Sequence, residues 1–164
     1  MSYFAAALAR TPAGWTAEEL DLDGLTDVDA VADRVRDVDG EAETALLFVE
    51  EDDEYVAILR VDADDLRVFV SHSQAAESYP VAGIFAGAVE EERAPSDLDD
   101  DEEEDEDQPD SEPVGDADLL ADLGTPRRDL IALVTHERTL PSDVISEVCE
   151  RAGCLDELET LRGA

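Results

Sequence analysis

Lysine is absent from this sequence, and cations of any kind are few. All 11 basic side chains are arginine, and they face 46 aspartates and glutamates, which leaves a net charge of −35 at pH 7. Nucleic-acid-binding proteins draw most of their affinity from Lys and Arg that neutralise phosphates, and no basic stripe occurs here. A helix-turn-helix-like stretch at 143–161 offers Asp156, Glu157 and Glu159 where a DNA-reading helix needs basic or amide side chains. The composition therefore predicts no direct binding to nucleic acid.

Long apolar runs are also missing. The amino-terminal stretch "MSYFAAALAR" lacks the basic start and the length of a secretory signal. No stretch approaches the ~20 apolar residues of a membrane span. Cysteine occurs only at Cys149 and Cys154, which is no disulfide framework. The sequence predicts a cytoplasmic protein that does not enter a membrane, and it leaves the oligomeric state open.

Familiar catalytic and cofactor-binding patterns are absent as well. There is no P-loop, no G-x-G-x-x-G and no G-x-S-x-G. The zinc deaminase signature needs H-x-E followed by P-C-x-x-C, but His136 is followed directly by Glu137 and no P-C-x-x-C exists. The chain is therefore not itself such a deaminase.

Cys149, Cys154, His136 and His72 are the residues from which a metal site could be assembled on paper. The gap between the cysteines departs from the usual zinc spacing, and Cys149 lies on an apolar helical stripe, where a free cysteine is commonly a small core residue. A nucleophilic pair of either cysteine with His136 would need a reactive thiol beside a base, and packing is again the favoured interpretation. We predict no catalytic, cofactor-binding or metal-binding residue, no cofactor and no enzymatic activity.

Apolar runs of strand length dominate the first half of the chain. Residues 3–9 and 14–22 predict a hairpin. Three further runs, separated by short polar turns, read TALLFVE, YVAILRV and LRVFVSH at 44–50, 55–61 and 66–72. Turns this short require adjacent antiparallel strands, and runs this continuous require cover on both faces. We predict an α+β fold with a mostly antiparallel four- to five-stranded sheet and two helices.

Helical periodicity occurs around and after these strands. Val28, Val31, Ala32 and Val35 recur at helical spacing, with Thr26 or Asp27 as the cap. Residues 73–90 predict a second helix that is broken near Pro80. The last part of the chain predicts a small helical bundle, marginal alone and a candidate to dock on the sheet. Its four short helices are expected at 116–124, 125–138 with Thr125 as the cap, 140–153 and 154–162.

Between these parts lies a segment with almost nothing to bury. Residues 90–115 are rich in Asp, Glu and Pro, so the segment cannot offset the entropy of its own ordering. We therefore divide the chain into an α+β sheet domain at 1–89, an acidic disordered linker at 90–115 and a small helical domain at 116–164.

Consecutive carboxylates form the centre of this linker. They are Asp99, Asp100, Asp101, Glu102, Glu103, Glu104, Asp105, Glu106 and Asp107. The favoured interpretation is a solvated spacer. The run is also a candidate docking tail for a basic protein surface, because its field would raise the encounter rate. A third interpretation is a mimic of a nucleic-acid backbone or a site for divalent cations, although the run lacks the glycine-containing spacing of a calcium loop.

Several stretches outside this run resemble one protein family. They are "MSYFAAALART", "GWTAEELDLDGLTDVDAVADRVRD", "TALLFVEEDDEYVAILRVD", "RVFVSH", "DLLADLGTP" and "LPSDVISEVCERAGCLDELETLR". The chain resembles the tRNA adenosine deaminase-associated proteins of actinobacteria, which are named for a gene beside that of the enzyme converting wobble adenosine to inosine. The resemblance implies a non-catalytic accessory protein that binds and modulates a tRNA adenosine deaminase, and it carries over no functional residue. The alternative is an acidic regulator, or nucleic-acid mimic, that blocks another basic nucleic-acid-binding protein.

Overall fold

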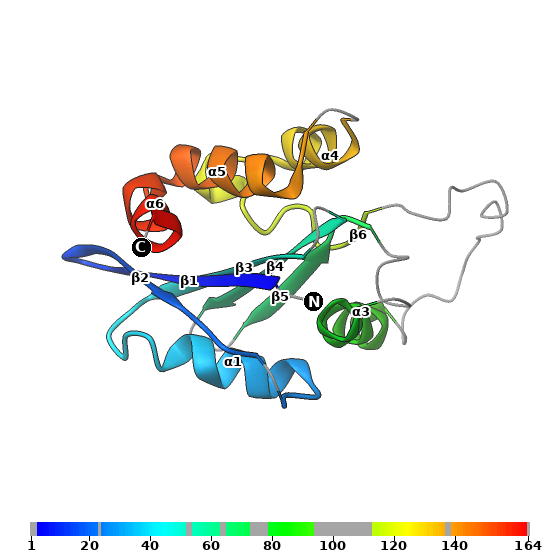
Figure 1. The fold of residues 1–164 in the computed structure, drawn as a ribbon, viewed down its shortest axis with the longest axis horizontal. Coiled ribbons are helices and arrows are strands. Elements are labelled where there is room, and N and C mark those ends of the chain that lie inside the picture. Colours follow the sequence, from blue (N-terminus) through cyan, green and yellow to red (C-terminus); the bar gives the residue numbers. More distant parts are fainter. Residues whose placement is uncertain are drawn as a thin grey trace, which may run out of the picture.

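One antiparallel sheet forms the centre of the molecule, with six strands in the order β2-β1-β3-β4-β5-β6 (Figure 1). The computed structural model describes residues 3–22, 24–51, 54–62, 65–72, 79–93, 113–136 and 139–163. The strands are β1 (Tyr3–Thr11), β2 (Gly14–Glu19), β3 (Thr44–Glu51), β4 (Tyr55–Asp62), β5 (Leu66–Val70) and β6 (Val114–Gly115). The predicted hairpin and the predicted meander are both present, and each neighbouring pair is antiparallel.

A tight turn closes the β1–β2 hairpin. The Thr11 hydroxyl accepts a hydrogen bond from the Ala13 amide and donates one to the Gly14 carbonyl, both at 3.1 Å. Gly14 has φ 131°, a conformation that side-chain-bearing residues rarely adopt. Because β3 pairs with the other side of β1, the first strand lies inside the sheet and β2 becomes an edge.

Two helices cover one side of the sheet, which we call the α1 side. They are α1 (Val28–Arg36) and α3 (Pro80–Arg93), and both lie below the sheet in Figure 1. The α1 side holds a core cluster to which Ala7, Leu47 and Leu59 contribute from the strands. Helix α1 adds Val31, Ala32 and Val35, the stripe that its periodicity predicts.

The start of each of these helices can be compared with its prediction. The Asp27 carboxylate accepts a hydrogen bond from the Ala30 amide at 2.9 Å, so Asp27 rather than Thr26 is the cap. Helix α3 begins at Pro80, where the sequence predicted a break, because proline is tolerated in a first turn. Residues 73–78 of the predicted helix lie outside the described part of the chain.

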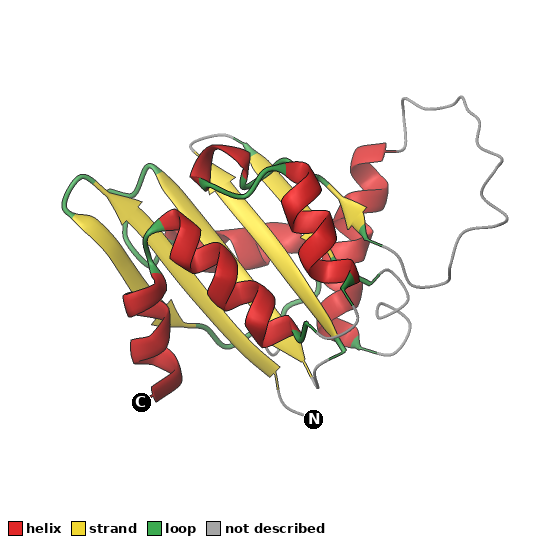
Figure 2. Cartoon of the chain, turned by 90° about the horizontal axis from the view of Figure 1, so that it is seen from above, coloured by secondary structure: helices red, strands yellow, loops and turns green. Residues whose placement is uncertain are grey.

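The opposite side, the α5 side, is covered by the last quarter of the chain (Figures 1 and 2). Its elements are the 3-10 helix η2 (Ala121–Leu123) and the helices α4 (Arg127–Thr135), α5 (Pro141–Ala152) and α6 (Leu155–Gly163). Their apolar side chains share one core cluster with the sheet, including Leu46, Phe48, Ile58, Ile145 and Leu158. The continuous apolar strands are thus covered on both faces.

Two details of this C-terminal part correct the sequence predictions. Residues 116–124 form a turn and the short η2, not an α-helix, and end at Gly124 with φ 104°. The N-cap of α4 is Pro126, so Thr125 lies one position too early to cap it. The hydroxyl of Thr125 is instead buried without a hydrogen-bond partner.

The predicted count of four or five strands is too low. Strand β6 lies inside the predicted linker and pairs with the end of β5. Gly115 has φ 105°, and a Cβ there would overlap the Val68 carbonyl oxygen, so this close pairing needs glycine. Two residues show no periodicity, which is why the sequence does not predict them. Residues 94–112, the rest of the predicted linker beyond α3, lie outside the described residues.

Across the described ranges, the helices lack the length and apolarity that crossing a bilayer requires.

Candidate functional site

The predicted docking run from Asp99 to Asp107 lies outside the described residues, but the points where its segment joins the fold are clear. The segment follows α3, which ends at Arg93, and precedes β6, which begins at Val114. Helix α3 and strand β6 contact one another (Figure 1). The segment that contains the run therefore connects two elements that contact one another.

Exposed carboxylates also gather on α1 and on the loop that leads from it to β3. We define these as the α1 acidic surface: Asp27, Asp29, Asp33, Asp37, Glu41 and Glu43. The two arginines of α1 are turned to partners within the chain. Arg36 Nη1 lies 3.5 Å from the Asp33 carboxylate, and Arg34 donates to the Asp21 carbonyl at 2.8 Å. The surface therefore stays strongly negative.

Other arginines also form ion pairs with acidic side chains of the same chain. The pairs are Arg67–Asp116 at 3.8 Å, Arg127–Asp118 at 3.0 Å and Arg151–Asp129 at 2.8 Å. Exposed pairs of this kind contribute only about 0–1 kcal/mol each to stability. Their larger effect is on recognition, because they reduce the positive charge that the described surface presents to a partner.

Arg60 is a buried cation on the α5 side, with 7 % of its surface exposed. Its guanidinium donates to the Leu119 carbonyl at 2.6 Å and to both oxygens of Asp122 at 2.6 and 3.0 Å. The hydrogen bond between Arg60 and Asp122 raises the pKa of Arg60 and lowers the pKa of Asp122. This bidentate contact holds η2 near the C-terminal end of β4 and so positions the C-terminal helices.

A buried carboxylate lies on the α1 side, at the end of β3. Glu51 is 4 % exposed, and its Oε1 accepts a hydrogen bond from the Tyr55 hydroxyl at 2.9 Å. The ring of Tyr55 lies 5.5 Å from that of Tyr79. Burial, and then the hydrogen bond to Glu51, raise the pKa of Tyr55 far above its ordinary value of 10.0. Tyr55 is therefore a permanent neutral donor to the buried carboxylate, which is a structural role.

Ser71 and His72 follow β5 and place a hydroxyl beside an imidazole. Ser71 Oγ lies 2.8 Å from His72 Nδ1 and accepts a hydrogen bond from the Val56 amide at 2.9 Å. Burial lowers the pKa of His72, although the charge of Glu54 opposes this shift. A nucleophile needs an approachable oxygen beside its base. Ser71 is 2 % exposed and already bonded to the backbone of β4, so the pair terminates the sheet rather than presenting a nucleophile.

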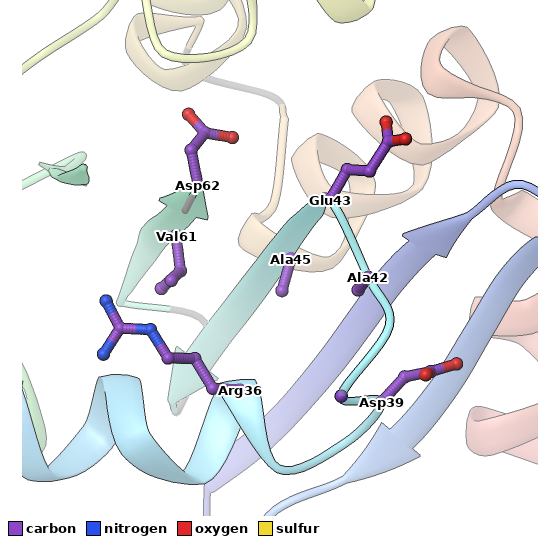
Figure 3. A pocket seen from close by; sticks show the side chains of 8 residues that line it. Arg36, Asp39, Ala42, Glu43, Ala45, Val61 and Asp62 are labelled. Atoms are coloured by element: carbon purple, nitrogen blue, oxygen red, sulfur yellow. The ribbon is translucent and has the colours of Figure 1, made fainter. Parts of the chain in front are cut away.

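A shallow pocket of about 170 Å³ lies between the end of α1 and the ends of β3 and β4 (Figure 3). Ala42, Ala45 and Val61 contribute apolar surface to it. Figure 3 shows the carboxylates of Glu43 and Asp62 pointing away from Ala45 and Val61. Asp62 instead accepts a hydrogen bond from the Thr44 hydroxyl at 2.8 Å. An active site brings polar groups together at one point, and these groups diverge.

Cys149 and Cys154 have a structural explanation at the end of α5. The amides of Gly153 and Cys154 both donate to the Cys149 carbonyl at 2.9 Å, and Gly153 has φ 93°. In this kind of helix end the first and last residues of the motif commonly make an apolar contact. Both cysteines are buried in the α5-side cluster.

The two histidines considered for a metal site do not lie with the cysteines. His136 lies at the exposed end of α4, and His72 lies after β5. Within the described ranges, no three side chains of His, Cys, Asp or Glu are grouped as a metal site requires.

Sequence analysis missed both buried charges, although each leaves a visible signal. Arg60 interrupts the apolar run of β4, and Glu51 ends that of β3. A charge inside such a run requires a buried partner. Arg60 has a nearby partner in Asp62, at 3.2 Å, but its shorter contact, at 2.6 Å, is with Asp122, which is 62 positions away and is indicated by no local pattern.

One known protein family matches almost the whole length of the chain. Residues 3–155 match the family described as Rv3753c-like tRNA adenosine deaminase-associated protein. No curated protein and no solved structure matches the chain. Because the family match spans both sides of the sheet, it confirms the resemblance seen in the sequence: the chain belongs to the Rv3753c-like tRNA adenosine deaminase-associated protein family.

Proposed function

We propose that this protein is a non-catalytic accessory protein that binds a tRNA adenosine deaminase and modulates it in the cytoplasm. The observation that carries the proposal is membership of a family described as deaminase-associated. The charge supports it, because an enzyme that holds tRNA needs a basic face for phosphates, and a chain of net charge −35 complements such a face. The same charge opposes a direct grip on tRNA.

Two acidic regions are proposed to take part in docking. One is the α1 acidic surface, where Asp29 and Asp33 lie on the exposed face of the helix. The other is the run from Asp99 to Asp107, as a docking tail, with the solvated spacer as its alternative. Such charges steer encounter over about 30 Å at 0.01 M salt, but over only about 8 Å at 0.15 M. Binding is therefore expected to weaken steeply with salt.

The direct test mixes the purified protein with the tRNA adenosine deaminase of the same organism and follows the complex by size exclusion at low and high salt. Two variants divide the acidic regions between them. In the first, residues 99–107 are replaced by a Gly/Ser segment of equal length. In the second, Asp29 and Asp33 become Asn, which removes charge from α1 without touching its buried stripe.

Each outcome has one meaning. A salt-sensitive complex that needs residues 99–107 makes the run a docking tail. A complex that survives the Gly/Ser replacement and fails with D29N/D33N assigns docking to α1 and leaves the run a spacer. The absence of a complex at every salt concentration rejects the accessory function.

An acidic regulator of another basic nucleic-acid-binding protein is the second candidate. It is favoured by the arginines that are paired within the chain, such as Arg127 with Asp118. These pairs leave a surface dominated by carboxylates, which can bind basic proteins of different kinds. A control protein of matched positive charge separates the two proposals. Tighter binding to the deaminase than to this control supports the accessory function, whereas equal binding supports the general regulator.

A further inference from the structure

The two edges of the sheet differ greatly in what they offer to another chain. Strand β6 is two residues long, whereas β2 is a full strand of six residues. The amide of Leu20 donates to the Ala5 carbonyl at 2.9 Å, so Leu20 and every second residue before it direct their backbone groups toward β1. In the register of that pair, Thr16 and Glu18 bond to β1, so the N–H and C=O groups of Trp15, Ala17 and Glu19 point outward.

One face of this edge is covered and the other is open. Helix α6 lies over β2, where Trp15 and Ala17 pack against the α5-side cluster (Figures 1 and 2). Thr16 and Glu18 are on the other face and are exposed. A strand added beyond β2 would therefore have a helix over one face and solvent on the other, as β2 has now.

The charge around the edge is negative. The elements that form it, β1, β2 and α6, carry two arginines against the carboxylates of Glu18, Glu19, Asp156, Glu157 and Glu159. Natural edge strands are often protected by proline or lysine, and β2 has neither within its bounds. Its edge carries the carboxylates of Glu18 and Glu19 instead, which repel acidic strands and attract basic ones.

We propose that the outer edge of β2 accepts an extended basic segment of a partner protein, which pairs with Trp15, Ala17 and Glu19 as a seventh strand. Backbone hydrogen bonds supply the pairing. Basic side chains at alternate positions of the added strand all lie on the open face, beside Glu18, and the apolar side chains between them lie on the face that α6 covers. A second copy of the chain is disfavoured as the occupant, because each copy carries a net charge of −35. The inference rests on the proposed function only for the identity of the partner.

The variants separate backbone pairing from charge. Ala17→Pro removes one outward N–H without breaking a β1–β2 hydrogen bond, since that amide does not face β1. Glu18→Arg with Glu19→Arg reverses the charge at the edge. Glu54→Arg with Asp65→Arg changes the net charge by the same amount at two exposed positions in the turns on either side of β4, away from β2 and from the α1 acidic surface, and is the matched control. Circular dichroism and thermal melts establish that each variant folds.

The probe is a peptide of alternating valine and arginine, about ten residues long, as fits one strand. Trp15 is the single tryptophan of the chain and lies in β2, so its fluorescence reports binding at the edge. We expect saturable binding that slows amide exchange at Trp15, Ala17 and Glu19. Ala17→Pro and the edge charge reversal should each weaken binding about tenfold or more, while the control pair should change it less than threefold.

Several results would overturn the proposal. One is unchanged amide exchange in β2 at saturating peptide. Another is equal weakening by the edge pair and the control pair, which would mean that only total charge matters. Protection of Trp15 that grows with protein concentration in the absence of peptide would make the occupant a second copy. Binding of the deaminase itself then separates the two proposals. If Ala17→Pro leaves deaminase binding unchanged, pairing at the β2 edge is rejected and the accessory function stands. If the peptide binds and the deaminase does not, the accessory function is rejected and pairing at the edge stands.

Discussion

The two sides of the sheet are closed by different parts of the chain. The α1 side is covered by α1 and α3, which lie among or directly after the strands, whereas the α5 side is covered by elements that follow residues 94–112. The buried carboxylate of the α1 side, Glu51, has its partner four positions away. The buried cation of the α5 side, Arg60, pairs with the nearby Asp62 and, more closely, with a residue 62 positions away. One side is therefore built from local contacts, and the other depends on a distant segment that must be held in place.

Removing that segment should have the largest effect. A fragment ending at residue 93 would expose Leu46, Phe48 and Ile58 together with the rest of their cluster. Each such side chain contributes about 1.5–3 kcal/mol when fully buried, and their sum approaches the ~5–15 kcal/mol stability of a typical domain. We expect the fragment to aggregate and to lose cooperative unfolding, as followed by circular dichroism and size exclusion. A monomeric fragment with a cooperative melt would instead support the predicted independent domain at 1–89.

Leu46 and Leu47 allow the two sides to be compared with one kind of substitution. They are neighbours in β3, both fully buried, and they belong to the α5-side and α1-side clusters respectively. Each Leu→Ala change should lower the free energy of unfolding by about 2–5 kcal/mol. Hydrogen exchange should accelerate in α5 for Leu46→Ala and in α1 for Leu47→Ala. The same exchange pattern in both variants would mean that the two sides open as one unit.

Arg60→Ala tests the long-range anchor. The change leaves the Leu119 carbonyl without its donor and Asp122 without its partner, so we expect a loss of about 1–3 kcal/mol in urea unfolding. Arg151→Ala is the control, because its pair with Asp129 lies at the surface, with side chains 31 % and 39 % exposed, and should cost about 0–1 kcal/mol. Equal losses would show that the burial of Arg60 adds nothing.

The two sides should also respond to opposite ends of the pH scale. The pKa of Tyr55 is raised, so its contribution on the α1 side is complete below pH 10.0 and is lost as the pH rises through the higher folded value. The pKa of Asp122 is lowered, so its contribution on the α5 side is complete above pH 3.8 and is lost as the pH falls through the lower folded value. Tyr55→Phe should reduce the alkaline sensitivity of the melt and leave the acid limb unchanged.

Replacing residues 96–112 by a Gly/Ser segment of equal length should have the smallest effect. The segment carries one large aliphatic residue, Leu98, and a constant length leaves the entropy of loop closure nearly unchanged. We expect the melting temperature to stay the same at high salt and to rise slightly at low salt, where fewer like charges repel. A large drop would contradict the predicted linker.

Features set by local pattern were predictable from the sequence, and features set by distant pairing were not. Val31 and Val35 mark the buried stripe of α1 because helical spacing is a local property. Strand β6 and the partner of Arg60 depend on contacts between remote residues, which no short window of sequence contains.

The same division applies to the candidate site. The acidic run from Asp99 to Asp107 is visible in composition alone, and its role stays a prediction. The hairpin that contains Trp15 was predicted, but its position at the outer edge follows from β3 pairing with β1. That order is a property of the assembled sheet.

The late position of the α5-side helices also has a consequence for synthesis on the ribosome. A chain elongating at about 5–20 residues per second completes α6 about 5 to 20 seconds after the end of β5, which lies about 90 residues earlier. During that interval Leu46, Phe48 and Ile58 have no helices to cover them. The nascent chain thus exposes an apolar sheet face that chaperones can bind. The acidic run is synthesised before the helices that cover this face, so its charge can keep neighbouring nascent chains apart while the face is exposed.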